Sequence, residues 1–200
     1  MGINQKKVWD NIAEEWYKFK TSPAEHVLRF LKGRKGKILD LGSGAGRHLK
    51  KIPSGKMYLV DFSDNMIKLA KKRAKEKKID AEFFVSDLTK LPFEDNFFDA
   101  AIMIAVLHCI KGEKNRKKAV EELFRVLKPK AKAEIAVWNK NSKKFMKSAK
   151  ERYVKWREKG ERYYYLFDAD EIYNLFEQAG FKITFKEEPT RNIVFEVQKI

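Results

Sequence analysis

Glycine occupies every second position in the turn of the stretch from Ile38 to Arg47, which reads I-L-D-L-G-S-G-A-G-R. Glycine allows positive φ and lets a ligand approach the backbone without meeting a Cβ. A helix predicted to begin near Arg47 would point its free N–H groups at the turn. The pattern is G-x-G-x-G, not the G-x-G-x-x-G of dinucleotide-binding folds. The turn alone does not identify a ligand, and the residues that follow it in the chain give the further indication of which ligand it binds.

Two acids end the next two apolar runs. Asp61 closes the run M-Y-L-V and lies 21 residues after the acid of the glycine turn, about the distance at which an acid meets a ribose in nucleotide-binding βαβ units. Asp87 follows F-F-V, where it could accept a hydrogen bond from an adenine amino group, with Leu88 beside the ring. Ordinary turn acids or helix caps remain the alternative interpretation of both. Together with the glycine turn, they indicate a nucleoside-binding edge of a parallel sheet.

The stretch D-L-G-S-G-A-G-R-H-L and the order of these acids resemble the class I S-adenosylmethionine-dependent methyltransferases, from about Val8 to the C-terminus. The resemblance implies an α/β fold with a Rossmann-like, doubly wound seven-stranded sheet. It implies the strand order 3-2-1-4-5-7-6, with all strands parallel but one. The whole chain, residues 1–200, is expected to form a single domain.

The resemblance also implies S-adenosylmethionine as cofactor and S-adenosylhomocysteine as product. The residues expected to bind the cofactor are Asp40, Leu41, Gly42, Ser43, Gly44, Asp61, Phe62, Met66, Asp87, Leu88, Ala105 and Tyr17.

Composition is consistent with one intracellular domain. Two hundred residues can bury a sizeable core. No segment resembles a signal peptide or reaches the length of a membrane span, which predicts a soluble, cytoplasmic protein without a membrane partner. The single cysteine, Cys109, excludes an internal disulfide, and no metal site is expected.

Charge points to an anionic partner. The chain has 44 Lys and Arg against 28 Asp and Glu, a formal net charge of +16, which favours nucleic acid. Richness in Lys and Glu is also typical of hyperthermophiles, but thermophily usually raises both signs together, whereas cations dominate here.

The strands and helices that alternate along the chain predict one doubly wound domain. N-terminal helices are expected within 5–32, and their aromatic residues would pack on the sheet or shelter the cofactor. Between the fifth strand and the last helix lies an insertion, residues 139–165, rich in Lys and Arg. Phe145, Ala149, Tyr153 and Trp156 have helical spacing, so the insertion is predicted to be a basic helix.

The later segments resemble one subfamily. These segments are I-A-V-L-H-C-I, V-W-N, R-Y-Y-Y-L-F, A-G-F and R-N-I-V-F-E-V-Q-K. They are similar to the tRNA wobble-uridine carboxymethyl methyltransferases, including the methyltransferase domain of the human AlkB-type homologue. That resemblance implies esterification of the carboxylate of 5-carboxymethyluridine in the tRNA anticodon. It also implies a small zinc-ribbon activator protein, which we expect to pair with the exposed third strand, residues 82–85.

A carboxylate acceptor is already ionised near pH 7, so methyl transfer to it needs alignment rather than a base. Lys20, Arg162 and Arg191 are candidates to orient the acid. His108, after the fourth strand, either positions the substrate or is a structural histidine. Residues expected to contact the RNA are Lys143, Lys147 and Arg152 on its phosphates and Tyr164 on a base.

Two other functions remain possible from the sequence. A small-molecule methyltransferase, acting on a quinone carbon or a metabolite oxygen, would share the glycine turn and the L-K-P that ends the helix before the fifth strand. A non-catalytic RNA-binding module would have no use for intact cofactor residues. Ionic strength distinguishes the first from a tRNA enzyme, because only binding to a polyanion weakens steeply with salt.

Overall fold

The computed structural model describes residues 3–200; residues 1 and 2 of the predicted domain lie outside the described part. The strands are β1 (Gly36–Leu41), β2 (Gly55–Asp61), β3 (Ala81–Val85), β4 (Phe98–Ile104), β5 (Leu127–Trp138), β6 (Glu151–Lys155), β7 (Glu161–Tyr165), β8 (Phe181–Lys186) and β9 (Asn192–Lys199). The helices are α1 (Gln5–Phe19), α2 (Glu25–Leu31), α3 (Asp64–Lys77), the 3-10 turn η1 (Leu107–Cys109), α4 (Glu113–Val126) and α5 (Ala169–Gln178).

The main sheet has seven strands in the order β3-β2-β1-β4-β5-β9-β8. The pairs from β3 to β5 are parallel, and β9 is antiparallel to both β5 and β8. Counting without the β6–β7 hairpin, which forms a separate two-stranded sheet, the order is 3-2-1-4-5-7-6 with one antiparallel strand. The predicted fold class and strand order are therefore confirmed.

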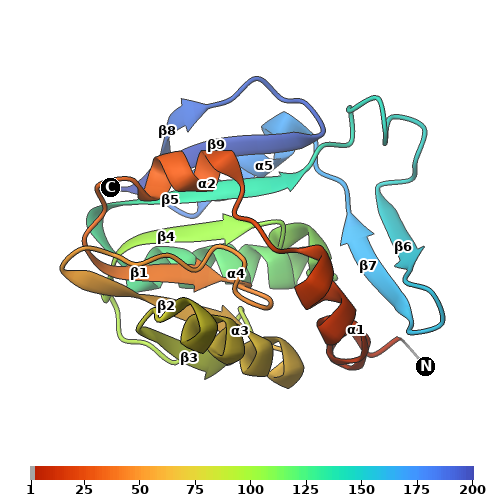
Figure 1. Cartoon of the computed structure of the whole chain (residues 1–200). Coiled ribbons are helices and arrows are strands. Elements are labelled where there is room, and N and C mark those ends of the chain that lie inside the picture. Colours follow the sequence, from red (N-terminus) through yellow and green to blue (C-terminus); the bar gives the residue numbers. More distant parts are fainter. Residues whose placement is uncertain (1–2) are drawn as a thin grey trace.

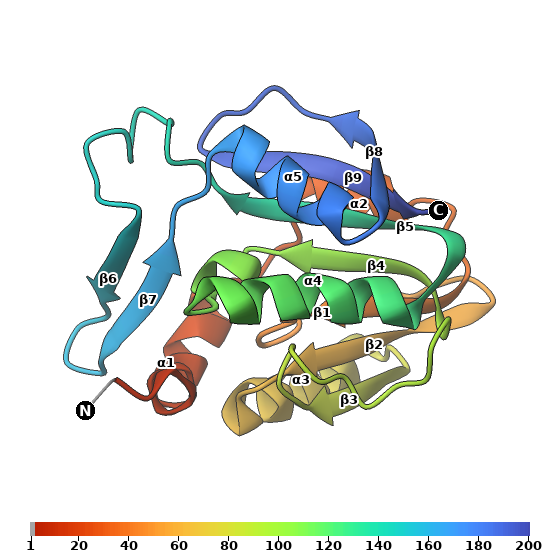
Figure 2. The same cartoon turned by 180° about the vertical axis from the view of Figure 1, so that it is seen from behind.

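Helices cover both faces of this sheet. Helices α2 and α3 lie on the face seen in Figure 1, and α4 and α5 lie on the opposite face, seen in Figure 2. One apolar core lies under α4 and α5 and includes Phe98, Leu123 and Phe176. A smaller core under α2 and α3 includes Phe30 and Ala70. Since apolar side chains are buried on both faces, the central strands are nearly continuous apolar runs, as expected for a parallel sheet.

The predicted helical insertion at 139–165 is wrong. Residues 139–150 form turns, and β6 and β7 form an antiparallel hairpin that stands apart from the main sheet (Figure 1). The helical spacing did not predict the structure, because the strands of this segment contain four Tyr and one Val, residue types that favour strands. Gly160 turns the hairpin with φ +128°. Phe145 is buried as expected, but Tyr153 is 40% exposed.

The helix predicted to begin near Arg47 is also absent from the described residues 42–54, which form successive turns before β2. Gly44 and Gly46 have φ of +52° and +70°, values that interrupt a right-handed helix. The connection from β1 to β2 therefore contains no helix, and the N–H groups of Gly42, Ser43, Gly44 and Gly46 donate to acceptors within the protein.

Within residues 3–200, no helix combines the length and the apolar character needed to cross a bilayer.

Candidate functional site

A cavity of about 610 Å³ lies at the carboxyl ends of the central strands. In Figure 1, α1 and β7 lie beyond the arrowheads of β1, β2 and β4 and enclose this edge of the sheet. The cavity is lined by the glycine turn, by residues at the ends of β2, β4 and β5, and by side chains of α1 and β7. Open α/β sheets bind ligands at this edge, which makes the cavity the candidate site.

The glycine turn is fixed from below and open to the cavity. The N–H groups of Gly42 and Ser43 both donate to the Val60 carbonyl, at 2.8 and 3.0 Å. A Cβ at Gly42 would lie 2.1 Å from a methyl carbon of Val106. A Cβ at Gly44 would meet only Trp16 and Met66, at 3.7 and 4.0 Å, and both of these side chains line the cavity. The turn therefore leaves a cradle that a side chain at Gly44 would fill.

Asp61 holds the turn in place. Its carboxylate accepts from the N–H of Gly44 at 2.8 Å and from the N–H of Ser63 at 3.0 Å. Ser63 in turn caps α3. Burial raises the pKa of Asp61 to about 6, partly opposed by these backbone hydrogen bonds. Asp61, the predicted ribose acceptor, therefore lines the cavity. It also holds the glycine turn in place, and such a structural role was the alternative interpretation of this acid.

Most of the other predicted cofactor residues line the same cavity. They are Ser43, Phe62, Met66, Asp87, Leu88 and Ala105. Asp87 also closes a turn, because its carboxylate accepts from the N–H and the hydroxyl of Thr89 at 2.8 and 2.7 Å.

Three predicted cofactor residues do not line the cavity. Leu41 belongs to the apolar core. Tyr17 faces α3, where its hydroxyl donates to Glu76 at 2.6 Å. Asp40 is buried beneath the turn, with one carboxylate oxygen lacking a hydrogen-bond partner among residues 3–200. Burial raises the pKa of Asp40 to about 7. Because Asp40 lies beneath the turn, it can affect a ligand only by supporting the turn.

His108 and Tyr164 meet at an aromatic wall of the cavity. His108 Nδ1 accepts from the Trp138 N–H at 3.0 Å, and burial lowers the pKa of His108 to about 3. The neutral ring therefore carries its proton on Nε2 and is a hydrogen-bond donor. Trp138 is stacked between Tyr164 and Phe145, with ring centroids 4.2 and 4.9 Å away.

Four cations line the cavity: Lys20, Arg47, Lys111 and Arg191. Lys111 donates to the Tyr153 hydroxyl at 3.0 Å. Within the described chain, no side chain of the other three forms an ion pair or donates a hydrogen bond. Desolvation first, then the charges of Arg47 and Arg191, lowers the pKa of Lys20. Desolvation also lowers the pKa of Arg47. Arg47 was not identified from the sequence, although its place directly after the glycine turn was a usable signal.

Arg162, predicted to orient the substrate, does not line the cavity. It is 6% exposed and donates to the Tyr164 hydroxyl at 2.7 Å. Its guanidinium lies 4.7 Å from the Trp156 ring centroid and 5.6 Å from that of Trp16. Its position therefore supports the aromatic cover of the cavity, and contact of Arg162 with the substrate stays a prediction.

The predicted RNA contacts lie outside the cavity. Lys143 and Lys147 are exposed on the turns before β6. Arg152 is half-buried, donates to the Ser148 hydroxyl at 2.8 Å and packs over Phe145.

Two histidines, the buried His48 and the partly buried His26, were also missed by sequence reasoning. His48 lines the cavity, is 3% exposed, and its Nε2 has no hydrogen-bond partner among the described residues. Burial lowers its pKa well below the ordinary value, so the ring is neutral. His26 lines the cavity from the start of α2. His48 lies in the stretch D-L-G-S-G-A-G-R-H-L that carries the family resemblance, which was a usable signal. His26 belongs to no such motif, and only tertiary packing brings it to the site.

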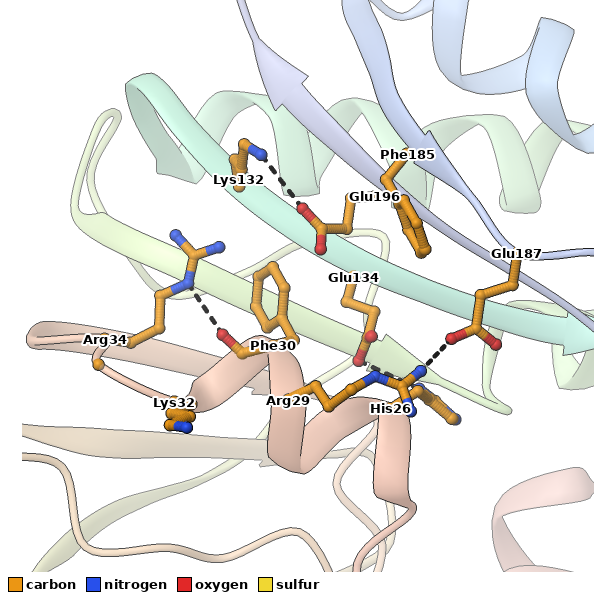
Figure 3. A pocket seen from close by; sticks show the side chains of 11 residues that line it. His26, Arg29, Phe30, Lys32, Arg34, Lys132, Glu134, Phe185, Glu187 and Glu196 are labelled. Carbon is orange, nitrogen blue, oxygen red and sulfur yellow. Dashed lines mark hydrogen bonds and ion pairs between the residues drawn. The ribbon is translucent and has the colours of Figure 1, made fainter.

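A second cavity of about 450 Å³ lies between α2 and strands β5, β9 and β8 (Figure 3). Its charged side chains are largely paired with one another. Lys132 contacts Glu196 at 3.2 Å, and Arg29 contacts Glu187. His26, which lines both cavities, lies 3.2 Å from the buried Glu134. This pairing makes the second cavity a poorer candidate for an anionic ligand than the first.

Comparison with known proteins gives a consistent result. Residues 39–135 match the family described as "Methyltransferase domain". The tRNA (carboxymethyluridine(34)-5-O)-methyltransferase of Arabidopsis thaliana is 37% identical over 134 residues, which cover 66% of this chain and 32% of that protein. The ubiquinone/menaquinone biosynthesis C-methyltransferase UbiE of Pseudomonas putida is 29% identical over 58% of this chain and 47% of that protein.

Solved structures share the fold. An S-adenosylmethionine-dependent methyltransferase of Methanosarcina mazei has a TM-score of 0.72 and 25% identity, covering 90% of this chain and 99% of that one. A methyltransferase of Haloferax volcanii, solved in complex with the Trm112 methyltransferase activator, has a TM-score of 0.72 and 18% identity over 97% of this chain and 95% of that one. The chain spans about a third of the length of the Arabidopsis relative.

Proposed function

The chain belongs to the class I S-adenosylmethionine-dependent methyltransferases, and on that premise we propose that it methylates the carboxylate of 5-carboxymethyluridine at the wobble position of tRNA. The cofactor of this family supplies an electrophilic methyl group on a sulfonium centre. The chain's own residues have to bind that cofactor, present the acceptor in line with the methyl group, and exclude water.

The residues present fit the cofactor. The cradle at Gly44 leaves room for a ligand against Trp16 and Met66. The Asp61 carboxylate faces the cavity and is the group we assign to the ribose hydroxyls, with Asp87 and Leu88 at the purine. Because Asp61 also holds the glycine turn, cofactor binding and the geometry of the turn depend on the same side chain.

The observation that carries the choice of acceptor is the group of three unpaired cations, Lys20, Arg47 and Arg191. Unpaired charges in a partly desolvated cavity are unfavourable unless a ligand neutralises them. The methionyl carboxylate of the cofactor supplies one negative charge, and an acidic acceptor supplies another. We assign Lys20 and Arg191 to the acceptor, because both were expected there from the sequence and both line the cavity.

The groups at the end of β4 are suited to this acceptor rather than to one that needs deprotonation. His108 offers an N–H donor and no free lone pair on Nδ1. Burial raises the pKa of the Cys109 thiol well above its ordinary value, so it is not a nucleophile. A carboxylate needs neither a base nor a nucleophile from the protein, and His108 can donate to one of its oxygens or to the uracil edge.

RNA contacts outside the cavity are assigned to the insertion. Lys143 and Lys147 extend into solvent beside the hairpin, where they can bind phosphates. Arg152 is partly committed to Ser148, and Tyr164 is stacked on Trp138. We therefore assign Tyr164 to the wall that flanks the target base rather than to an open stacking platform.

Strand β3 is the proposed site of a zinc-ribbon activator. It forms one edge of the sheet and pairs only with β2 in the described residues, and Val85 is 45% exposed. An open edge offers unpaired backbone groups to a strand of another protein. We expect Val85→Lys to weaken co-elution with such an activator in size-exclusion chromatography. Phe185→Lys, on the opposite edge strand, is the matched control and should leave co-elution unchanged.

The test of the proposed function is methyl transfer from labelled S-adenosylmethionine to tRNA that carries 5-carboxymethyluridine, with and without the activator. Transfer to this tRNA, and none to tRNA that carries the corresponding amide, is the expected result. Lys20→Gln and Arg191→Gln should each lower kcat/KM about tenfold to a hundredfold, the size of a lost hydrogen bond to a charged group. Lys182→Gln, an exposed lysine on β8, is the control. Cofactor binding without transfer to either tRNA would rule the proposal out.

A small-molecule methyltransferase is the second candidate function. The aromatic wall of Trp138 and Tyr164 could pack against an apolar ring, as a quinone would require, and the family includes quinone C-methyltransferases such as UbiE. Carbon methylation removes a proton from the acceptor, and the neutral His48 with its free Nε2 is the group we would assign to that step. Transfer to quinone precursors, unaffected by Arg191→Gln, would favour this function.

A further inference from the structure

Helix α3 carries a continuous stripe of exposed lysines. Lys68, Lys71, Lys72 and Lys75 follow the i, i+3, i+4, i+7 spacing that places residues on one face of a helix. All four are exposed, as are Lys77 and Lys78 at the end of the helix. From Lys68 to Lys78, the stripe together with the two lysines that follow it is roughly 15 Å long at the usual helical rise.

These lysines lack acidic partners. None of the six forms an ion pair or donates a side-chain hydrogen bond within residues 3–200. The helix has two acids: Asp64 is paired with Lys6, and Glu76 accepts from Tyr17. Surface lysines that stabilise a protein against heat act in networks with acids. A stripe with no such network costs free energy through like-charge repulsion, which a bound polyanion would relieve.

Among the described helices, α3 has the largest excess of cations. It has six Lys and Arg residues against two acids, whereas α4 has five against three and α5 has three acids and neither Lys nor Arg. In α1 and α2 the two signs balance. Since α2 and α3 cover one face of the sheet and α4 and α5 the other (Figures 1 and 2), the helices on the α3 face have a net charge of +4 and those on the opposite face −1.

The lysine stripe extends along α3 in the direction away from the candidate site. Helix α3 begins at the cavity, where Ser63 caps it and Met66 lines the wall, and it packs against α1 (Figure 1). A polyanion lying along α3 would therefore reach the cavity mouth at the start of the helix. Glu76, which accepts from Tyr17, is the one acid between Lys68 and Lys78, and no large apolar side chain is exposed between Asp64 and Lys78. This surface favours a phosphate backbone over a membrane.

We propose that the α3 lysine stripe, Lys68–Lys71–Lys72–Lys75, binds the phosphate backbone of the RNA substrate and places the body of that RNA along the α3 face. This inference rests on the proposed tRNA function. The target nucleoside enters the cavity from the α1–α3 side, and the lysines of the insertion hold the nucleotides on its other side.

The experiment compares two triple variants of the full chain. Lys68→Gln/Lys71→Gln/Lys75→Gln removes the stripe and keeps Lys72, which lies 5.6 Å from the Tyr17 ring. Lys114→Gln/Lys117→Gln/Lys118→Gln on α4 is the control, with the same change of charge on the opposite face of the sheet. Binding of a tRNA transcript is measured by fluorescence anisotropy at several KCl concentrations, and methyl transfer is measured to free 5-carboxymethyluridine.

The stripe variant should bind tRNA at least tenfold more weakly than the wild type, with a slope of log Kd against log[KCl] reduced by about 2. The α4 variant should retain both values within twofold to threefold. Transfer to the free nucleoside should be unchanged in both variants, which shows that the fold and the cavity are intact.

Equal losses in the two triple variants would overturn the inference, because net charge alone would then explain them. Unchanged tRNA binding by the stripe variant would also overturn it. Failure of the wild type to bind tRNA at all would instead contradict the proposed function. Binding of the wild type to vesicles of anionic lipid but not to tRNA would show that the stripe meets a membrane.

Discussion

Asp40 and Asp61 are buried beneath the glycine turn, where charge is unfavourable. Desolvation raises the pKa of Asp40 to about 7 and that of Asp61 to about 6, both from an ordinary value of 3.8. Between about pH 4 and pH 7 these two carboxyls therefore hold more protons in the folded protein than in the unfolded chain. Their contribution to the stability of the cofactor-free protein should fall as pH rises through this window, whereas the buried neutral His48 and His108 contribute with the opposite sign below about pH 6.5.

Asp40→Asn should remove the larger part of this dependence. We expect the variant to lose less unfolding free energy than the wild type between about pH 4 and pH 8 in urea titrations. Glu14→Gln, an exposed acid on α1, is the control and should follow the wild type. An Asp40→Asn profile that runs parallel to that of the wild type over this range would contradict the burial argument.

Gly42 is required by its conformation and by its neighbour. Its φ is +73°, and an added Cβ would lie 2.1 Å from Val106. Gly42→Ala should cost about 2–4 kcal/mol of stability, combining left-handed backbone strain with overpacking, and should abolish cofactor binding in calorimetry. Gly33 has a similar φ of +77° with nothing within 4 Å. Gly33→Ala should therefore cost only about 1 kcal/mol and leave cofactor binding intact.

At the scale of elements, α1 and the β6–β7 hairpin form one cover over the cavity. Glu15 accepts from the Trp156 indole at 2.7 Å and contacts Lys159 and Arg157 at 3.1 and 3.3 Å. Gln5 donates to the Glu161 carbonyl and accepts from the Tyr163 N–H, at 3.1 and 2.9 Å. Since an isolated two-stranded hairpin is marginally stable, its order depends on this contact with α1.

Glu15→Ala should loosen the hairpin. We expect faster amide hydrogen exchange in residues 156–165 and a lower free energy of unfolding, because the substitution removes the hydrogen bond from Trp156 and the contacts with Lys159 and Arg157. Cofactor affinity should fall as well, because α1 supplies Trp16 and Lys20 to the cavity. The same substitution at the neighbouring exposed Glu14 should change none of these. Unaltered exchange in the hairpin would show that other contacts hold it.

At the scale of the whole molecule, a net charge of +16 governs how the substrate arrives. Methyl transfer to tRNA should fall steeply as KCl rises from about 50 to 200 mM, by tenfold or more in kcat/KM. Transfer to the free nucleoside should change little over the same range, because it involves few counterions. A flat salt profile for the preferred substrate would indicate a small acceptor and favour the second candidate function.

Much of the fold was determined by the sequence itself. The apolar runs, the glycine turn and the acids that follow the strands are local patterns that predicted a parallel sheet with a binding edge, and the family resemblance that they carry implied the strand order. Two local predictions were wrong. The spacing of Phe145, Tyr153 and Trp156 was consistent with a helix, but the segment is a hairpin because Gly160 turns it and α1 gives it a surface. The helix near Arg47 was excluded by the positive φ of Gly44 and Gly46.

Tertiary structure alone decided which charges meet. Lys20, Arg47 and Arg191 are far apart in the chain and share one cavity because the ends of α1, β1 and β9 converge at one edge of the sheet. Arg162 looked similar in the sequence but is buried among aromatic rings, because β7 turns it toward Trp156. A sequence pattern specifies the period of an element and the residues on each face. Which faces pack together is set by the whole fold, since only there does burial of distant segments contribute its free energy.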